Sequence, residues 1–490
     1  MSVRKVLLAS AEAHPFAKVG GLADVIGALT MALRQNGVDA RVALPKYSII
    51  DEKKFKLHFL LEIPEIPLGD RRVTARVYES TEPYPAYFFE GGDFFNRAGI
   101  YTDEKGTGYP DEPLRFTFFV KAILEALPRL GFKPDLIHAN DSHTALIPAL
   151  LQLKYNTNPF FSSIGTLFTI HNIAYQGNWD PSILDIIGVG HDQFYPMGGF
   201  EFYGKVNFMK TGIVYADAVS TVSPTYAREI MSSSEYGYGL EGVLAARSNR
   251  VFGILNGIDY AEWDPQVDTY LPVNYSAKSL EKKAEIKYAL LKELKLDLKK
   301  KDAPLFGVVS RLVEQKGIEL ICEVLPKIFE LGGLVVILGT GAEKYHLALG
   351  QIKEAFPGSL SLNLKFDVRL SHLIEAGADF FLMPSKYEPC GLNQMYSLRY
   401  GTLPIVRRTG GLADTVLDYT EHPDDGYGFV FETFSAPAFW KAIESAFELY
   451  RKPEKLDEVR RRAMKLDFSW KNSVLKYMEL YDKIYLWHNR

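Results

Sequence analysis

The chain has 490 residues, of which 47% are hydrophobic and 24% are charged, and its formal net charge is −4. This length exceeds what one hydrophobic core holds, so two or three globular domains are expected. The slightly negative charge argues against a nucleic-acid partner, and no apolar segment reaches membrane-spanning length. Two cysteines, Cys322 and Cys390, cannot form a disulfide framework and suit a reducing compartment. We therefore expect a cytoplasmic protein.

The first motif is a glycine turn between a buried strand and a helix. It reads Lys18-Val-Gly20-Gly21-Leu-Ala-Asp24, after the apolar run at 6–9. Bare amides and the positive end of a helix dipole form a seat for an anion at such a turn. The same Gly-Gly-Leu-Ala-Asp returns at 410–414, after Arg407, Arg408 and Thr409. We expect each turn to belong to its own nucleotide-fold domain, with the two turns facing each other across one cleft.

Buried strands alternate with polar turns and helices through the first half of the chain. Apolar runs predict strands at 40–44, 135–139, 164–170 and 251–255, and residues 73–78 and 84–89 alternate like half-exposed strands. This alternation indicates an α/β domain whose functional residues gather at the carboxyl ends of the strands. Asp141 and the segment His171-Asn172-Ile-Ala-Tyr175 follow two of these strands.

A second and more regular alternation fills the other half. It predicts strands at 305–309, 334–338, 360–366, 379–383 and 403–406. The lysine-rich helix at 282–295 is interpreted as a solvated face rather than a binding patch. An apolar stripe on the last helix, from Trp470 to Ile484, needs a groove to bury it, which a helix crossing back to the N-terminal domain provides. The domains are placed at 1–255, 256–465 and 466–490.

Four strand-end turns carry cations, a carboxylate or glycine: those at Lys18, Arg311 with Lys316, Glu388, and Arg408. A diphosphate leaving group is held either by a metal with carboxylates or by cations with backbone amides. The sequence offers the second arrangement, because it shows neither a strand-end Asp-x-Asp pair nor a His/Cys cluster with metal spacing. Lys344 stands where a dinucleotide fingerprint needs its third glycine, so a nicotinamide cofactor is not expected either.

Each of these residues has a simpler interpretation when taken alone. Lys18 reads as a solvated lysine, and Arg311 and Lys316 read as surface charges. His171 reads as a structural histidine, and Glu388 reads as a helix-capping carboxylate. Cys390 reads as a small buried hydrophobe. The functional interpretation is favoured because all of these residues lie on strand-end turns.

Several long motifs, in order from residue 3 to about 485, resemble the bacterial glycogen synthase and plant starch synthase family. They are Lys18-Val-Gly-Gly-Leu-Ala-Asp, His171-Asn-Ile-Ala-Tyr-Gln-Gly, Ser223-Pro-Thr-Tyr-Ala, Asn256-Gly-Ile-Asp, Ser310-Arg-Leu with Gln315-Lys-Gly, and Glu388-Pro-Cys-Gly-Leu through Arg408-Thr-Gly-Gly-Leu-Ala-Asp. The resemblance implies a GT-B glycosyltransferase with two Rossmann-like doubly wound domains. It also implies transfer of glucose from ADP-glucose or UDP-glucose to the non-reducing 4-hydroxyl of an α-1,4-glucan, with retention. No metal or other cofactor is expected, and the partners are a nucleotide sugar and glycogen, starch or a maltooligosaccharide. If the source bears plastids, the resemblance implies a mature stromal protein instead of a cytoplasmic one.

The resemblance also assigns residues to roles. His171, Glu388, Arg311 and Lys316 are expected at the reacting centre, where Arg311 and Lys316 neutralise the diphosphate. The residues expected to contact the donor are Lys18, Gly20, Gly21, Phe366, Cys390, Gly391, Leu392, Thr409 and Gly410. Those with weaker support as sugar contacts are Asp141, Asn172 and Tyr175. Related retaining transferases carry a second glutamate at the position of Tyr396, so no carboxylate role is assigned there.

Two alternatives stay open at this point. One is a retaining GT-B enzyme with a sucrose or lipid acceptor, and the other is a non-catalytic glucan-binding protein with the same fold. An exposed basic amphipathic helix near the N-terminus would favour a lipid acceptor, and the sequence shows none. Loss of His171, Arg311, Lys316 or Glu388 would favour the binding protein, and all four are present.

Overall fold

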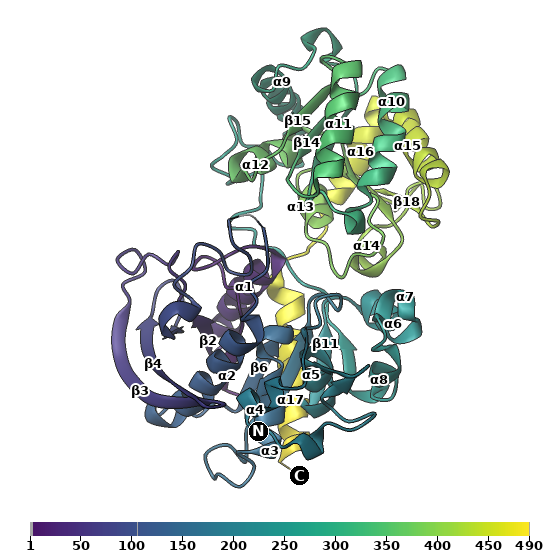
Figure 1. The fold of residues 1–490 in the computed structure, drawn as a ribbon. Helices are drawn as coiled ribbons and strands as arrows, with labels where there is room; N and C mark the ends of the chain where they lie inside the picture. The colour runs from purple at the N-terminus through teal and green to yellow at the C-terminus, as the bar shows by residue number, and fades with distance from the viewer. Residues whose placement is uncertain (1–2, 105, 490) are drawn as a thin grey trace. The chain divides into compact units, whose positions relative to one another are not determined.

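The computed structural model describes residues 3–104 and 106–489 (Figure 1). The chain forms two compact units, and each is described by itself. The N-terminal unit runs to Gly257 and also includes the chain from Trp470 onward, while the C-terminal unit is Ile258–Ser469.

The N-terminal unit is built on a nine-stranded sheet with the order β12-β11-β7-β6-β1-β2-β5-β4-β3. Its strands are β1 (Lys5–Ala9), β2 (Asp39–Pro45), β3 (His58–Leu68), β4 (Arg71–Ser80), β5 (Ala86–Glu90), β6 (Leu136–Asn140), β7 (Gly165–Ile170), β11 (Ala218–Thr221) and β12 (Val251–Gly253). A small separate sheet holds β8 (Asn178–Trp179), β9 (Glu201–Phe202) and β10 (Lys205–Asn207). The helices are α1 (Gly21–Gln35), α2 (Glu112–Arg129), α3 (Leu146–Leu153), α4 (Ile183–Ile187), α5 (Phe208–Tyr215), α6 (Pro224–Ser232), α7 (Ser234–Gly237), α8 (Glu241–Ala245) and α17 (Trp470–His488).

Most pairs in the large sheet are parallel, but β3 and β4 add an antiparallel edge. The buried runs at β1, β2, β6 and β7 confirm the sequence predictions to within about one residue. Strand β3 was not predicted. Only a few of its residues are buried, and Pro64 and Pro67 interrupt its alternation, so it carries no strand signature.

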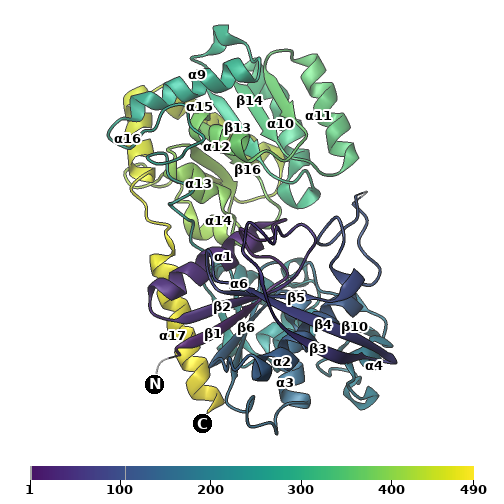
Figure 2. The same ribbon diagram turned by 90° about the vertical axis from the view of Figure 1, so that its left-hand side faces the viewer.

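Helices cover both faces of the large sheet, as β7 shows. A methyl group on Gly165 would lie 2.9 Å from Ile484 of α17, whereas Phe168 lies against Gly212 of α5. Residues an odd number apart along a strand point to opposite faces. Helix α17 therefore packs on the N-terminal unit, beside α1 (Figures 1 and 2). Its stripe Trp470, Val474, Tyr477, Tyr481 and Ile484 is buried, which confirms the prediction of a terminal helix returning to this unit.

The C-terminal unit has a six-stranded parallel sheet with the order β15-β14-β13-β16-β17-β18. Its strands are β13 (Leu305–Val309), β14 (Leu334–Leu338), β15 (Leu360–Asn363), β16 (Phe380–Met383), β17 (Leu403–Arg407) and β18 (Phe429–Phe431). The helices are α9 (Lys283–Glu293), α10 (Ile318–Glu330), α11 (Glu343–Ala355), α12 (Val368–Gly377), α13 (Asn393–Arg399), α14 (Gly410–Thr415), α15 (Ala436–Tyr450) and α16 (Pro453–Ala463). Phe306 packs on Phe447 of α15, and the adjacent Gly307 meets Ile374 of α12 on the other face.

Two predictions about this unit were wrong in part. Strand β15 ends at Asn363, so Phe366 lies beyond it in a loop and is 79% exposed. The lysines of α9 do not all face solvent: Lys283 and Lys287 are buried. The Lys283 ammonium donates to the Thr402 hydroxyl at 2.7 Å, and Lys287 pairs with Asp379 at 2.6 Å. Each buried lysine nitrogen thus has hydrogen-bond partners, although burial lowers the pKa of Lys283 well below its usual range.

None of the helices described for residues 3–104 and 106–489 is long and apolar enough to cross a membrane.

Helix α17 is joined to the sheet through the buried His138 of β6. Its Nδ1 lies 2.9 Å from the Tyr481 hydroxyl of α17, and its Nε2 lies 2.6 Å from the Thr169 hydroxyl of β7. Burial lowers the pKa of His138 to about 3. The imidazole is therefore neutral in the folded protein near pH 7.

His138 makes the free energy of unfolding depend on pH. The unfolded chain takes up a proton near the ordinary histidine pKa of about 6.5, whereas the native state takes it up near 3. This contribution to stability is therefore intact above pH 6.5 and falls by about 1.4 kcal/mol per pH unit below it. Urea unfolding between about pH 7 and 5 should show a slope that is smaller by about one proton in His138→Gln than in the wild type. An equal pH dependence of the unfolding free energy in the two proteins would contradict the lowered pKa of His138.

Candidate functional site

His171 lies directly after β7, at the carboxyl end of the large sheet. Its backbone amide donates to the Asp141 carboxylate at 2.8 Å, and its Nε2 lies 2.9 Å from the Asn140 side-chain oxygen. Asn140 is the last residue of the neighbouring parallel strand β6 and Asp141 follows it, so both lie at the carboxyl edge of the sheet, where functional residues of α/β domains gather. The structure thus brings His171 and Asp141 together, as the sequence predicts for adjacent strand ends.

Asn140 decides which nitrogen of His171 carries the proton. The Asn140 amide nitrogen donates to the carbonyls of Ala9 and His138, so its oxygen faces the histidine. Nε2 must then donate, which leaves the lone pair on Nδ1. Burial lowers the pKa of His171 below its ordinary value, with the Asp141 charge acting in the opposite direction. The imidazole is accordingly neutral near pH 7.

Asp141 is held in a conformation that aspartate seldom adopts. Its φ is 56° and its ψ is 178°, and the residue is buried. Strain of this kind persists only where surrounding contacts fix it, and it gathers at functional sites. The next residues along the His171 segment are also ordered: the Asn172 side chain accepts from the Ala174 amide at 3.1 Å, while Tyr175 is 53% exposed.

The glycine turn before α1 is partly filled by the protein itself. The amides of Val19 and Gly20 both donate to one oxygen of Glu12, the latter at 2.8 Å, and Tyr101 donates to the other oxygen at 2.7 Å. The turn is an anion seat, as the sequence predicts, but an internal carboxylate uses two of its donors. Lys18 pairs with Asp24 of the first helical turn at 2.7 Å. Gly21, the first residue of α1, stays a predicted donor contact.

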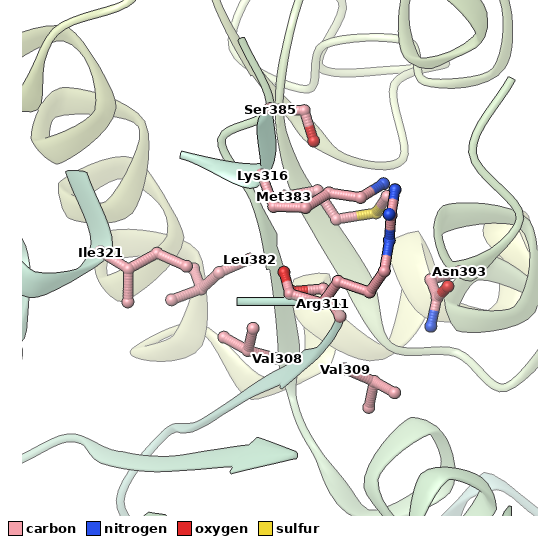
Figure 3. Close-up of a pocket in the computed structure, with 10 residues that line it drawn as sticks. Val308, Val309, Arg311, Lys316, Ile321, Leu382, Met383, Ser385 and Asn393 are labelled. Carbon is pink, nitrogen blue, oxygen red and sulfur yellow. The ribbon is translucent and has the colours of Figure 1, made fainter. Parts of the chain in front are cut away.

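A cavity of about 170 Å³ lies at the carboxyl ends of β13 and β16 in the C-terminal unit. Figure 3 shows the side chains of Arg311 and Lys316 extending from the β13 turn toward the same part of this cavity. Ser385 and Asn393 contribute polar atoms to the lining, and Val308 and Met383 contribute apolar ones. Two cations over one small cavity suit an anion with more than one charge.

Glu388 lies next to these cations and is only 5% exposed. Its Oε2 accepts from the Lys316 ammonium at 2.5 Å and from the Ser385 hydroxyl at 3.0 Å. An ammonium has three N–H groups, so this contact leaves others available to a ligand. The structure therefore joins three of the predicted residues, Arg311, Lys316 and Glu388, at one site of the C-terminal unit.

Two glycines, Gly410 and Gly411, pack closely against the backbone of the loop that carries Glu388. A β-carbon on Gly410 would lie 1.9 Å from the Glu388 carbonyl oxygen, and one on Gly411 would lie 2.0 Å from that of Cys390. The Gly411 amide donates to the Glu388 carbonyl at 3.1 Å. The second glycine motif thus supports the loop, and its preceding Arg408 pairs with Glu421 and Glu432. Thr409 and Gly410 stay predicted donor contacts.

Helix α13 begins directly after Cys390, Gly391 and Leu392. Gly391 has a φ of 69°, and Cys390 is 5% exposed. Glu375 of α12, fully buried, accepts from Asn393 at 3.1 Å and from Ser397 at 2.6 Å. Burial raises the pKa of Glu375 to about 8. The sequence did not single out Glu375, because a glutamate within a helix pattern does not reveal which side chains it contacts.

Tyr396 of α13 occupies the position at which related retaining transferases carry a second glutamate. Its ring stacks on Trp263 with centroids 3.9 Å apart, and His372 stacks on the opposite face of Trp263 at 3.8 Å. The next turn of α13 adds an ion pair between Arg399 and Asp264. Tyr396 is therefore part of an aromatic stack that fixes α13, and through it the loop that carries Glu388. The spacing of these residues in the sequence gives no hint of the stack.

Within the part of the chain that the structure describes, no group of three or more His, Cys, Asp or Glu side chains is arranged to hold a metal ion.

Comparisons with known proteins agree with these observations. Residues 5–246 match the family described as the starch synthase catalytic domain, and residues 292–463 match glycosyl transferases group 1. The glycogen synthase of Syntrophotalea carbinolica is 43% identical over 479 residues, which cover 98% of each chain. That of Thermotoga maritima is 43% identical over 487 residues, again 98% of each chain.

Two solved structures are similar along almost the whole chain. The catalytic domain of starch synthase IV from Arabidopsis thaliana, bound to ADP and acarbose, has a TM-score of 0.92 and 37% identity. It is covered completely and covers 99% of this chain. A sucrose-phosphate synthase from Thermosynechococcus elongatus has a TM-score of 0.62 and 18% identity, with 99% of each chain covered. The second similarity concerns the fold alone.

The Lys316–Glu388 pair should show measurable coupling. Lys316→Ala leaves the buried Glu388 carboxylate without its cation, so the free energy of unfolding should fall by about 2 kcal/mol. In a Glu388→Gln background the same substitution should cost at least about 0.5 kcal/mol less. Urea unfolding of the four variants gives the coupling energy. The exposed pair of Lys386 and Glu314 supplies the control, and Lys386→Ala should change stability little. Additive effects of Lys316→Ala and Glu388→Gln would contradict the coupling.

Proposed function

The chain belongs to the glycogen synthase and starch synthase family, and we propose that its donor is ADP-glucose and its acceptor the non-reducing end of an α-1,4-glucan. It is a glycosyltransferase of the GT-B fold that synthesises α-1,4-glucan. The observation that carries the proposal is the cavity where Arg311 and Lys316 converge beside the buried Glu388. The ADP in the starch synthase IV structure supports the choice of nucleotide.

Arg311 and Lys316 act on the leaving group. As the bond between C1 of glucose and the diphosphate breaks, negative charge grows on the phosphate oxygens, and fixed cations lower the barrier where it grows. Glu388 keeps the Lys316 ammonium in place before the substrate arrives. Gly391 and Leu392 offer backbone amides beside Glu388, and the Glu388 carboxylate accepts from glucose hydroxyls. A metal has no assigned part in this scheme.

His171 acts near the sugar as a neutral group. Loss of the diphosphate leaves positive charge on C1 and the ring oxygen, and a neutral imidazole adds no like charge there. The lowered pKa of His171 keeps it in this form. Lys18 contacts the donor, with Gly20, Gly21, Thr409 and Gly410, while Phe366 stacks on the base. Asp141, Asn172 and Tyr175 contact sugar hydroxyls.

The acceptor hydroxyl attacks C1 on the face from which the diphosphate leaves, and the departing phosphate takes the hydroxyl proton. This order of events retains the anomeric configuration without a covalent intermediate on the enzyme. Mass spectrometry of enzyme quenched during turnover should show only the unmodified chain mass. A trapped glucosyl–enzyme adduct would overturn this part of the proposal.

The first assay measures ADP release from ADP-glucose with and without glycogen. Release should depend on glycogen, and the glucose should appear in α-1,4 linkage at chain ends. Faster release of UDP from UDP-glucose than of ADP from ADP-glucose would show that UDP-glucose is the preferred donor. A rate of ADP release that does not depend on glycogen would contradict the proposed acceptor.

Arg311→Ala should lower kcat by about a hundredfold, because removal of one charge-stabilising group costs about 3 kcal/mol in the transition state. Arg311 is exposed, so the variant should keep the wild-type melting temperature. Arg369→Ala is the matched control, since Arg369 is an exposed arginine of the same unit paired with Glu293. Near-normal kcat in Arg311→Ala, measured by ADP release, would remove Arg311 from the reacting centre.

A further inference from the structure

Two exposed tyrosines of the N-terminal unit have a backbone conformation that tyrosine rarely adopts. Tyr203 is 84% exposed with a φ of 50°, and Tyr238 is 40% exposed with a φ of 52°. This left-handed region costs residues other than glycine about 1 kcal/mol. Tyr203 is thus largely exposed to solvent and Tyr238 is partly exposed. We call Tyr203 and Tyr238 together the tyrosine platform.

The two positions are turns at which other residues fold better. Tyr203 and Gly204 form the two-residue turn between β9 and β10, where Phe202 pairs with Lys205. Two positive φ values in such a turn favour Asn-Gly. Tyr238 ends α7 at a position that favours glycine or asparagine. The backbone conformation therefore does not favour tyrosine at either turn, and observed strain of this kind points to function.

The two turns pack against each other. A methyl group on Gly239 would lie 3.0 Å from the Phe202 ring and 3.5 Å from the Tyr203 ring. The rings of Phe202 and Tyr203 meet edge to face with centroids 4.7 Å apart. The turns that carry the two tyrosines, far apart in the sequence, thus lie side by side.

This surface is continuous with the segment that begins at His171. The Gln176 side chain donates to the Tyr238 carbonyl at 3.2 Å, and Asn207 at the end of β10 donates to Gln176 at 2.7 Å. Tyr175, the residue before Gln176, is itself exposed. The hydrogen bonds through Gln176 therefore fix the platform relative to the predicted sugar contacts.

We propose that the tyrosine platform binds glucose units of the α-1,4-glucan acceptor that lie away from its growing end. This inference rests on the proposed function. A glucose ring has an apolar C–H face that packs on an aromatic ring, and its hydroxyls pair with the phenol. Tyrosine offers both surfaces and loses little conformational entropy on binding. The flanking charges, Glu201 and Lys205, have opposite signs, which suits a neutral polymer better than an anionic lipid or nucleic acid.

The test uses the full chain carrying Tyr203→Asn and Tyr238→Asn together. Asparagine suits both turns, so the melting temperature should be equal to that of the wild type or higher. Affinity electrophoresis in glycogen should show a Kd about tenfold higher, which corresponds to about 1.4 kcal/mol. The KM for glycogen should rise by a similar factor, whereas the KM for ADP-glucose and for maltotriose should stay unchanged. Tyr288→Asn, at an exposed tyrosine of α9, is the matched control.

Several results would overturn the proposal. The first is an unchanged Kd for glycogen in the double variant, and the second is a KM for maltotriose that rises as much as the KM for glycogen. The third is a lower melting temperature that accompanies the weaker binding of glycogen. Unchanged glycogen affinity with altered sedimentation would assign the surface to self-association instead. Failure of the proposed function looks different: the wild type would release no glycogen-dependent ADP, while electrophoresis would still report whether the platform binds glycogen.

Discussion

The candidate site of the C-terminal unit depends on close contact between backbone segments. Gly410 and Gly411 let the Glu388 and Cys390 carbonyls approach to distances that a β-carbon forbids, 1.9 and 2.0 Å. Gly317 does the same beside Lys316, where a β-carbon would lie 2.1 Å from the Pro384 carbonyl. These contacts fix both partners of the Lys316–Glu388 pair by backbone, so the charges are positioned before a substrate binds. Such preorganisation is what makes a fixed cation effective in a transition state.

The same five residues, Gly-Gly-Leu-Ala-Asp, carry out different tasks in the two units. Before α1 the turn gives its amides to Glu12, so it works as a helix start with an internal anion. At 410–414 the glycines are needed because another loop lies against them. The sequence repeat therefore marks the starts of two helices, α1 and α14. What each turn does depends on the neighbouring chain, which the repeat does not contain.

The strands and turns that depend on local sequence patterns could be predicted from the sequence. Strands such as β13 and β14 were predicted with their observed bounds, because buried parallel strands are continuous apolar runs. The sequence also placed Arg311, Lys316 and Glu388 on turns that the structure brings together. The environments of side chains that depend on partners distant in the sequence could not be predicted. The burial of Lys287 depends on its ion pair with Asp379, which is 92 residues away in the sequence. The place of Tyr396 depends on its stacking on Trp263, which is also distant in the sequence.

Backbone strain marks function only in combination with a second property. Lys56, Glu65 and Lys295 also have positive φ, but they are exposed charged residues, for which a surface turn is an ordinary place. Asp141 is different because its strained carboxylate is buried and accepts from His171. The tyrosine platform is different in the opposite sense, because its residues combine an unfavourable backbone conformation with side chains that are exposed to solvent. In both cases the backbone conformation and the surroundings are each unfavourable to the residue, a combination that is typical of functional sites.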